Sequence, residues 1–200
     1  MLNDAALAEF AASAYDQRPC FAVSDVHAIA GEADGARVLA IRGTTADPRD
    51  WLRDLAALPR HDPDLGWCHG GFCDGARGLL AAGGGRSAFG AGLWLTGHSM
   101  GGAIALLLGA LLCAHGLAPQ GIITFGAPRC GSWRLRRRLA RLPVRLYRNG
   151  DDPVPEVPWL PALYLHPRKL IAIGAASPDP FADHHMTAYQ RALAEEKIAT

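Results

Sequence analysis

Residues 95–103 read Leu95-Thr96-Gly97-His98-Ser99-Met100-Gly101-Gly102-Ala103, which sets one serine between two glycines. The apolar run 93–95 predicts a buried strand, and the apolar run from Gly101 to Cys113 predicts a buried helix. A serine on so sharp a strand-to-helix turn must adopt a strained backbone conformation. Glycine is needed at positions 97 and 101 because a Cβ at either would collide across the bend.

This turn has a chemical consequence, because the strain holds the Ser99 Oγ up into a cleft. It also leaves the backbone N–H of Met100 free to bind a developing oxyanion. The arrangement is typical of the nucleophile elbow of an α/β-hydrolase. In a chain with 23 glycines, such a pattern also arises by chance, as a turn that merely lets a helix pack closely on a sheet. The nucleophilic interpretation therefore needs a base and an acid elsewhere in the chain.

Length and composition limit the class of protein. A chain of 200 residues, half of them hydrophobic, suits one domain spanning residues 1–200 with one well-filled core. A net charge of +1 argues against a dedicated nucleic-acid binder. The most apolar segment, Ala103 to Ala114, is too short to span a bilayer and is interpreted as a core helix.

Cysteine usage and the N-terminus predict the compartment. The five cysteines are Cys20, Cys68, Cys73, Cys113 and Cys130. They lack the paired spacing of a zinc site or a secreted disulfide framework, so free thiols are expected, with a Cys68–Cys73 bridge as the alternative. Residues 1–4 lack the positive charge of a secretory signal. We therefore expect a cytoplasmic protein.

Strand and helix patterns alternate along the chain. Helices are predicted over 2–15, 50–58, 71–82, 101–113 and 132–142, and from an N-cap at Asp183 to about Lys197. Strands are predicted over 21–29, 37–41, 93–95, 122–125 and 144–148, with a strand region over 164–173. This alternation predicts an α/β fold of the α/β-hydrolase type, with a mostly parallel central sheet and helices on both faces.

An acid is expected after Ser99, because triad partners in this fold follow in the order nucleophile, acid, base. The predicted strand 144–148 runs into Asn149-Gly150-Asp151-Asp152-Pro153-Val154-Pro155. Asp152 is the better candidate because Pro153 forces it into an extended conformation. The alternative is that both aspartates are simply polar turn formers.

The base must come later in the chain, where the histidines are His166, His184 and His185. His166 precedes a proline in strand-like sequence and is interpreted as structural. The other two lie just before the last predicted helix, where an imidazole can reach both Ser99 and Asp152. It would take the serine proton while the carboxylate fixes its tautomer. Residue chemistry leaves the choice between His184 and His185 open.

With these motifs in place, residues 15–193 resemble the class 3 lipases, the fungal-lipase-like α/β-hydrolases. The segment Ile41-Arg42-Gly43-Thr44-Thr45 is similar to the family's oxyanion loop, and 50–55 to its lid segment. His69-Gly70-Gly71-Phe72 resembles its His-x-Gly-Phe signature, and residues 97–103 resemble its elbow. Residues 124–128 and 152–155 look like the following strand and the acid loop.

The resemblance implies a role for each matched residue. Ser99 corresponds to the nucleophile and Asp152 to the acid. The family's base stands after an aspartate and five residues before a tyrosine, and this frame selects His184. The backbone N–H groups of Thr44 and Met100 correspond to the oxyanion hole, with the Thr44 hydroxyl as a further donor. His69 and His98 then take structural roles.

The implied activity is hydrolysis of carboxylic esters through an acyl-enzyme, without metal or organic cofactor. Lipid or glyceride esters are the expected substrates. Short to medium acyl chains are favoured among them, because the polar lid segment 45–51 suits an oil interface poorly. Phospholipase or lysophospholipase activity is the alternative, and a non-catalytic lipid-binding protein is a further one. The expected substrate-binding residues are Trp51, Val154, Val157 and Trp159.

The basic segment 134–142 has two interpretations. Leu135, Leu139 and Leu142 fall at helical spacing and would face the sheet, leaving the arginines as a solvated outer face. The alternative is a weak site for anionic headgroups, giving peripheral contact with lipid surfaces. The sequence gives no indication of the oligomeric state.

Overall fold

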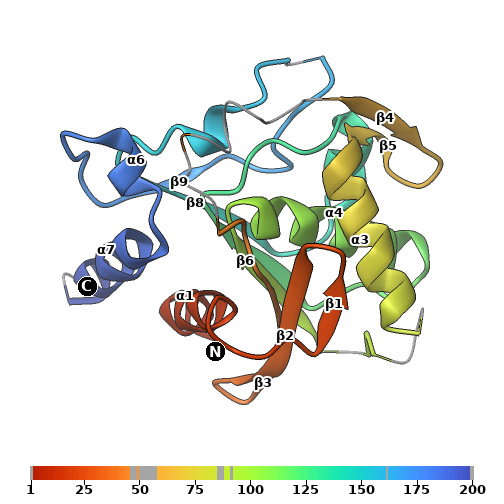
Figure 1. Ribbon diagram of the computed structural model, residues 1–200, viewed down its shortest axis with the longest axis horizontal. Helices are drawn as coiled ribbons and strands as arrows, with labels where there is room; N and C mark the ends of the chain where they lie inside the picture. The colour runs from red at the N-terminus through yellow and green to blue at the C-terminus, as the bar shows by residue number, and fades with distance from the viewer. Residues whose placement is uncertain are drawn as a thin grey trace.

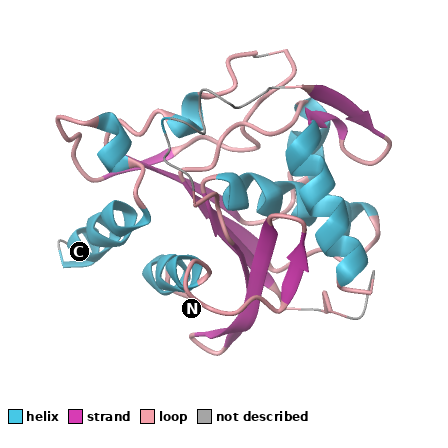
Figure 2. Ribbon diagram, in the orientation of Figure 1, coloured by secondary structure: helices cyan, strands magenta, loops and turns pink. Residues whose placement is uncertain are grey.

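The computed structural model describes residues 2–45, 49, 58–84, 88–90, 92–160 and 162–198. Its centre is a seven-stranded sheet with the strand order β1-β2-β3-β6-β7-β8-β9 (Figures 1 and 2). The strands are β1 (Phe21–Val23), β2 (Val26–Ala33), β3 (Ala36–Ile41), β6 (Trp94–His98), β7 (Gly121–Phe125), β8 (Val144–Asn149) and β9 (Ile171–Ile173). Strands β1, β2 and β3 pair antiparallel, and every pair from β3 to β9 is parallel. The predicted mostly parallel sheet is confirmed.

Helices cover both faces of this sheet, as Figure 1 shows. One face carries α1 (Asp4–Ser13) and α7 (Met186–Ile198), and the other carries α3 (Gly70–Ala82), α4 (Met100–Ala114) and α5 (Trp133–Arg138). The strands supply both layers because successive side chains point to opposite faces. Val38 packs with α1 and α7, whereas the next residue, Leu39, packs with α3 and α4.

Two predicted strands are shorter in the structure than the sequence suggests. The run 21–29 divides into β1 and β2 because Ser24, with φ 49°, makes a tight turn between them. The strand region 164–173 keeps only β9 as a strand of the sheet, and Leu165 forms an isolated bridge to Gly131. Apolar composition without a clear period could not separate these strands from the loops beside them.

Two predicted helices also have different ends in the structure. The basic helix 132–142 ends at Arg138, and the Arg168 guanidinium donates to the carbonyls of the residues that follow it, Leu139 and Ala140. Asp183 is not the N-cap of the last helix, because it ends the short helix α6 (Pro180–Asp183). Its carboxylate instead accepts backbone N–H groups. The predicted helix 50–58 lies outside the described residues apart from its last position.

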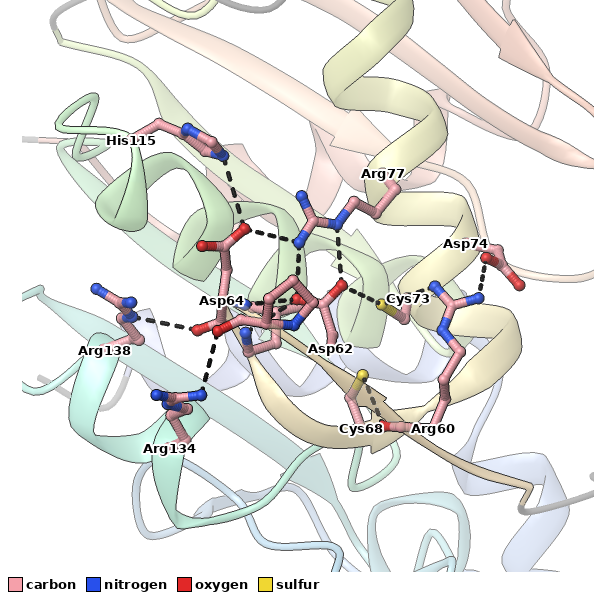
Figure 3. A network of polar contacts seen from close by, with 12 residues as sticks. Arg60, Asp62, Asp64, Cys68, Cys73, Asp74, Arg77, His115, Arg134 and Arg138 are labelled. Atoms are coloured by element: carbon pink, nitrogen blue, oxygen red, sulfur yellow. Dashed lines mark hydrogen bonds and ion pairs between the residues drawn. The ribbon is translucent and has the colours of Figure 1, made fainter.

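A small antiparallel sheet, β4 (Pro59–Asp62) with β5 (Gly66–His69), was not predicted. Its turn is held by a polar network that Figure 3 shows in close view. Asp62 accepts two hydrogen bonds from Arg77 on α3, at 3.0 and 2.7 Å, and Arg77 also reaches Asp64 at 2.7 Å. Arg138 on α5 donates to the Asp64 carbonyl. The network therefore joins the turn to two helices.

All five cysteines are free thiols in the structure, so the Cys68–Cys73 bridge is not formed. Within the described residues, no helix combines the length and apolar character that crossing a membrane requires.

Candidate active site

Ser99 lies directly after β6 and is the N-cap of α4, with φ 56° and ψ −131°. A positive φ with this ψ is strained for a residue with a side chain. The turn is tight enough to exclude side chains, since a Cβ on Gly97 would lie 2.5 Å from the Gly101 carbonyl carbon. A Cβ on Gly101 would overlap the Ile41 carbonyl oxygen on the neighbouring strand β3. The predicted need for glycine at both positions is confirmed.

The structure brings Ser99, His184 and Asp152 together. The His184 Nε2 lies 3.0 Å from the Ser99 Oγ, and the His184 Nδ1 lies 2.8 Å from Asp152 Oδ2. The carboxylate can only accept, so Nδ1 carries the proton and the Nε2 lone pair faces the serine hydroxyl. All three side chains are buried, with Asp152 at 0% exposure. This is the geometry by which a hydroxyl is activated as a nucleophile.

The acid is held by further contacts that the sequence did not reveal. Asp152 Oδ1 accepts the Val154 backbone N–H at 2.9 Å, and Oδ2 accepts the Tyr189 hydroxyl at 2.6 Å. Burial and the Asp152 charge raise the pKa of Tyr189 well above its ordinary value, so its hydroxyl stays a donor. In the sequence, Tyr189 served only as a marker for the spacing of His184.

The neighbouring His185 lies elsewhere. It is exposed and lines the cavity beside Ser99, whereas His184 is the histidine that contacts both Ser99 and Asp152. His166 also lies apart, with its Nε2 donating to the Pro155 carbonyl at 2.7 Å. His69 is the N-cap of α3 and accepts the Phe72 N–H through Nδ1. The expected structural positions of His166 and His69 agree with these contacts.

The loop after β3 passes directly against the elbow. A Cβ on Gly43 would lie 3.1 Å from the Ser99 Cβ and would overlap the Tyr15 hydroxyl. The next residue, Thr44, lines the same cavity as Ser99. Met100 is the first residue of α4, so the helix itself does not use its N–H. Both expected oxyanion donors therefore belong to segments that meet at Ser99, and their role stays a prediction.

Ser99 and Met100 each line a cavity. The first, of about 960 Å³, contains Ser99 and His184 and has Glu9 and Gln190 among its lining residues. The second, of about 790 Å³, is bounded by Met100, Phe72 and other apolar side chains, together with polar residues of the β4 and α3 segments. The cavity at Ser99 is lined by polar and apolar side chains alike, and the cavity at Met100 is the more apolar of the two.

Three of the four expected substrate-binding residues lie in the described part of the chain, and they do not line these cavities. Val154 is fully buried, and Trp159 is 73% exposed with the Arg129 guanidinium 5.2 Å from its ring centre. Neither residue, nor Val157, is among the described residues that line either cavity. Trp51 lies outside the described residues. The substrate contacts expected from the 154–161 segment therefore have no support in the described geometry.

A strained serine after a parallel strand, with an acid and then a histidine from later loops, defines an α/β-hydrolase. The comparison with known proteins assigns the family. Residues 38–161 match the family Lipase (class 3), and the chain belongs to it.

Similar proteins include two lipid hydrolases. The "Secreted mono- and diacylglycerol lipase 1" of Fusarium solani is 38% identical over 74 residues, which cover 36% of this chain and 22% of that protein. The "Phospholipase A1-Igamma2, chloroplastic" of Arabidopsis thaliana is 34% identical over 94 residues, covering 42% of this chain and 18% of that protein. The matched region thus spans about a fifth of each relative.

Among solved structures, the Rhizomucor miehei lipase in its propeptide complex superposes with a TM-score of 0.62 and 25% identity. The match covers 76% of this chain and 54% of that one. The likeness extends over most of this chain, so the α/β-hydrolase fold is shared with a lipase of known structure.

Proposed function

We propose that this chain hydrolyses carboxylic esters, with Ser99 as nucleophile, His184 as general base and Asp152 as the acid that orients it. The observation that carries the proposal is the continuous contact from the Ser99 Oγ through His184 to Asp152, at 3.0 and 2.8 Å. Membership of the class 3 lipase family supports the same assignment.

The reaction follows from these contacts. His184 takes the Ser99 proton through Nε2 as the Oγ attacks the ester carbonyl, and Asp152 stabilises the imidazolium that forms. The N–H groups of Thr44 and Met100 bind the oxyanion. His184 then gives its proton to the leaving alcohol, and a water molecule activated by His184 hydrolyses the acyl-enzyme. No step requires a metal or organic cofactor.

Lipid or glyceride esters with short to medium acyl chains are the proposed substrates. The more apolar cavity, which Met100 lines, suits an acyl chain, and the cavity that contains Ser99 and His184 offers polar groups to a hydroxyl-bearing alcohol. Relatives named for mono- and diacylglycerols and for phospholipids support this class. Phospholipase or lysophospholipase activity is the second candidate, favoured by the phospholipase relative alone.

Compartment and partners are also proposals. Five free thiols support a reducing compartment such as the cytoplasm, although one relative is named as secreted. Trp133, 61% exposed at the start of α5, stands with the exposed Arg136 and Arg137, which supports weak contact with anionic lipid surfaces. We propose no nucleic-acid partner, and we propose that residues 1–200 act as one domain.

The deciding experiment compares wild type with Ser99→Ala on p-nitrophenyl butyrate. The substitution removes the nucleophile, so turnover is expected to vanish while the far-ultraviolet circular dichroism spectrum is unchanged. Labelling by a fluorophosphonate is expected in the wild type alone. Undiminished turnover by Ser99→Ala refutes the proposal. An unlabelled, inactive wild type favours a non-catalytic lipid-binding protein instead.

A separate set of hydrolysis assays decides the substrate class. Mono- and diacylglycerols of increasing chain length are compared with phosphatidylcholine and lysophosphatidylcholine, using wild type and Ser99→Ala. Faster turnover of the glycerides supports the first candidate. Preference for the choline lipids replaces it by the second.

A further inference from the structure

We propose that His98 is a positioning residue for His184, which it holds through a hydrogen bond to the main chain in a neutral form selected by Tyr15. The proposal rests on the proposed function, since it concerns the base of that reaction. It assigns a purpose to a residue that the sequence placed only beside the elbow.

Contacts at both nitrogens fix the tautomer of His98. Nε2 lies 2.7 Å from the carbonyl oxygen of His184, which can only accept, so Nε2 carries the proton. Nδ1 then presents a lone pair, and it lies 2.8 Å from the Tyr15 hydroxyl, which must donate. His98 is 5% exposed, so water does not replace either partner. The chain of donors runs in one direction, from Tyr15 through His98 to His184.

The charge state of His98 also suits this role. Burial, and then the nearby His184, lower the pKa of His98 well below its ordinary value. The two imidazole ring centres are 4.7 Å apart. A charged His98 would oppose the positive charge that His184 acquires when it takes the serine proton. A buried neutral donor holds the base without adding that repulsion.

A second side chain holds the preceding residue of the same loop. The Asn149 Nδ2 donates to the Asp183 carbonyl at 3.0 Å, so consecutive carbonyls of residues 183 and 184 are both bound. His98 ends β6 and Asn149 ends β8, two strands of the parallel sheet. The rigid sheet edge thereby fixes the main chain of the base, and Asp152 fixes its ring.

Substitutions at position 98 test whether this contact serves catalysis. His98→Leu removes the donor, so kcat on p-nitrophenyl butyrate is expected to fall about ten- to a hundredfold because the base loses alignment. KM is expected to stay within about twofold, because His98 lines the cavity but is only 5% exposed and offers substrate little surface. His98→Gln offers an amide N–H in place of Nε2–H and is expected to recover most of kcat.

Tyr15→Phe provides an independent arm, because it leaves the His98 ring in place and frees its tautomer. Its kcat is expected to fall about three- to tenfold with KM unchanged. The proton on His184 Nδ1, bound to Asp152, should give a far-downfield proton NMR signal in the wild type. This signal is expected to weaken or shift in His98→Leu and to return in His98→Gln.

The outcomes separate this proposal from the one on which it rests. If Ser99→Ala is inactive but His98→Leu retains full kcat and an unchanged downfield signal, the positioning role is wrong and the proposed function stands. Equal activity of His98→Leu and His98→Gln, or a change confined to thermal stability, also overturns it. If His98→Leu does not fold, the other two variants decide. Full kcat in Tyr15→Phe rejects the proposal, and so does a His98→Gln variant as inactive as Ser99→Ala.

Discussion

The Tyr189 hydroxyl donates to Oδ2 of Asp152 at 2.6 Å, and this is the same oxygen that binds the His184 Nδ1 at 2.8 Å. One carboxylate oxygen therefore joins the last helix of the chain to the candidate base. The side chains of Tyr189 and Asp152 are fully buried, so the hydrogen bond from Tyr189 compensates for a carboxylate that water cannot reach.

Tyr189→Phe should destabilise the fold and lower activity together. Removing a partner from a buried charged group costs about 1.5–3 kcal/mol, so the free energy of unfolding in urea should fall by that amount. We expect kcat to fall as well, because Asp152 loses one of its orienting contacts. A matched control is Tyr147→Phe, which removes a hydroxyl bound to Asp4 away from the site. Equal kcat losses in the two variants would contradict a specific role for Tyr189.

Replacing the two adjacent histidines, His184 and His185, should have very different effects on activity. His184→Ala removes the group that contacts Ser99 and Asp152, and kcat should fall by roughly four orders of magnitude. His185→Ala changes an exposed residue at the cavity wall and should stay within about threefold of wild type. Initial rates on p-nitrophenyl butyrate measure both. An inactive His185→Ala beside an active His184→Ala would show that the assignment of the base is reversed.

The sequence predicted the parallel core of the fold because its signals are local. The elbow at Ser99 carries its own strand, turn and helix in one segment, and the alternating apolar runs place the parallel strands. The β4–β5 hairpin was not predicted because β4 is short and polar, with only Asp62 buried. The hydrogen bonds to Asp62 come from Arg77, which lies 15 positions later in the sequence, on α3.

The site shows the same division between local and long-range information. The frame before Tyr189 selected His184, which contacts Ser99 in the structure, but no spacing rule could show that Tyr15 and His98 touch across 83 positions. The expected acyl-side residues Val154, Val157 and Trp159 do not line the two cavities described, because their segment was interpreted from composition alone. Val154 turned out to be packed in the interior.

Gly101→Ala should disrupt the elbow severely. The added Cβ would overlap the Ile41 carbonyl, which belongs to the paired strand β3 and cannot move without breaking the sheet. We expect a loss of about 3 kcal/mol or more in the free energy of unfolding. Gly71→Ala is the matched control near the start of α3, where the nearest atom would lie 3.7 Å away. Alanine there should be neutral or stabilising by up to about 1 kcal/mol. Urea melts of both variants check this contrast, and equal stability would contradict it.

Asp62 should give the fold a measurable acid dependence. Burial acts to raise the pKa of this carboxyl, but Arg77 and the N–H groups of Leu65 and Asp64 outweigh it and hold the pKa at about 2, below the ordinary 3.8. A group whose pKa is lowered in the folded state stabilises the fold above its unfolded pKa. That stabilisation is lost as pH falls from about 4 through about 2.

Asp62→Asn should therefore lower the free energy of unfolding by about 2 kcal/mol at pH 7, and the deficit should shrink as pH falls toward 2. Urea unfolding followed by tryptophan fluorescence at pH 7, 5, 4 and 3 measures this convergence. Asp74→Asn is the control, because Asp74 lies on the same helix as Arg77 and pairs with Arg60 of β4, but its side chain is 67% exposed. An exposed pair contributes about 0–1 kcal/mol, so this variant should change little at any pH. A deficit in Asp62→Asn that stays constant with pH would show that the carboxylate acts through packing rather than through its charge.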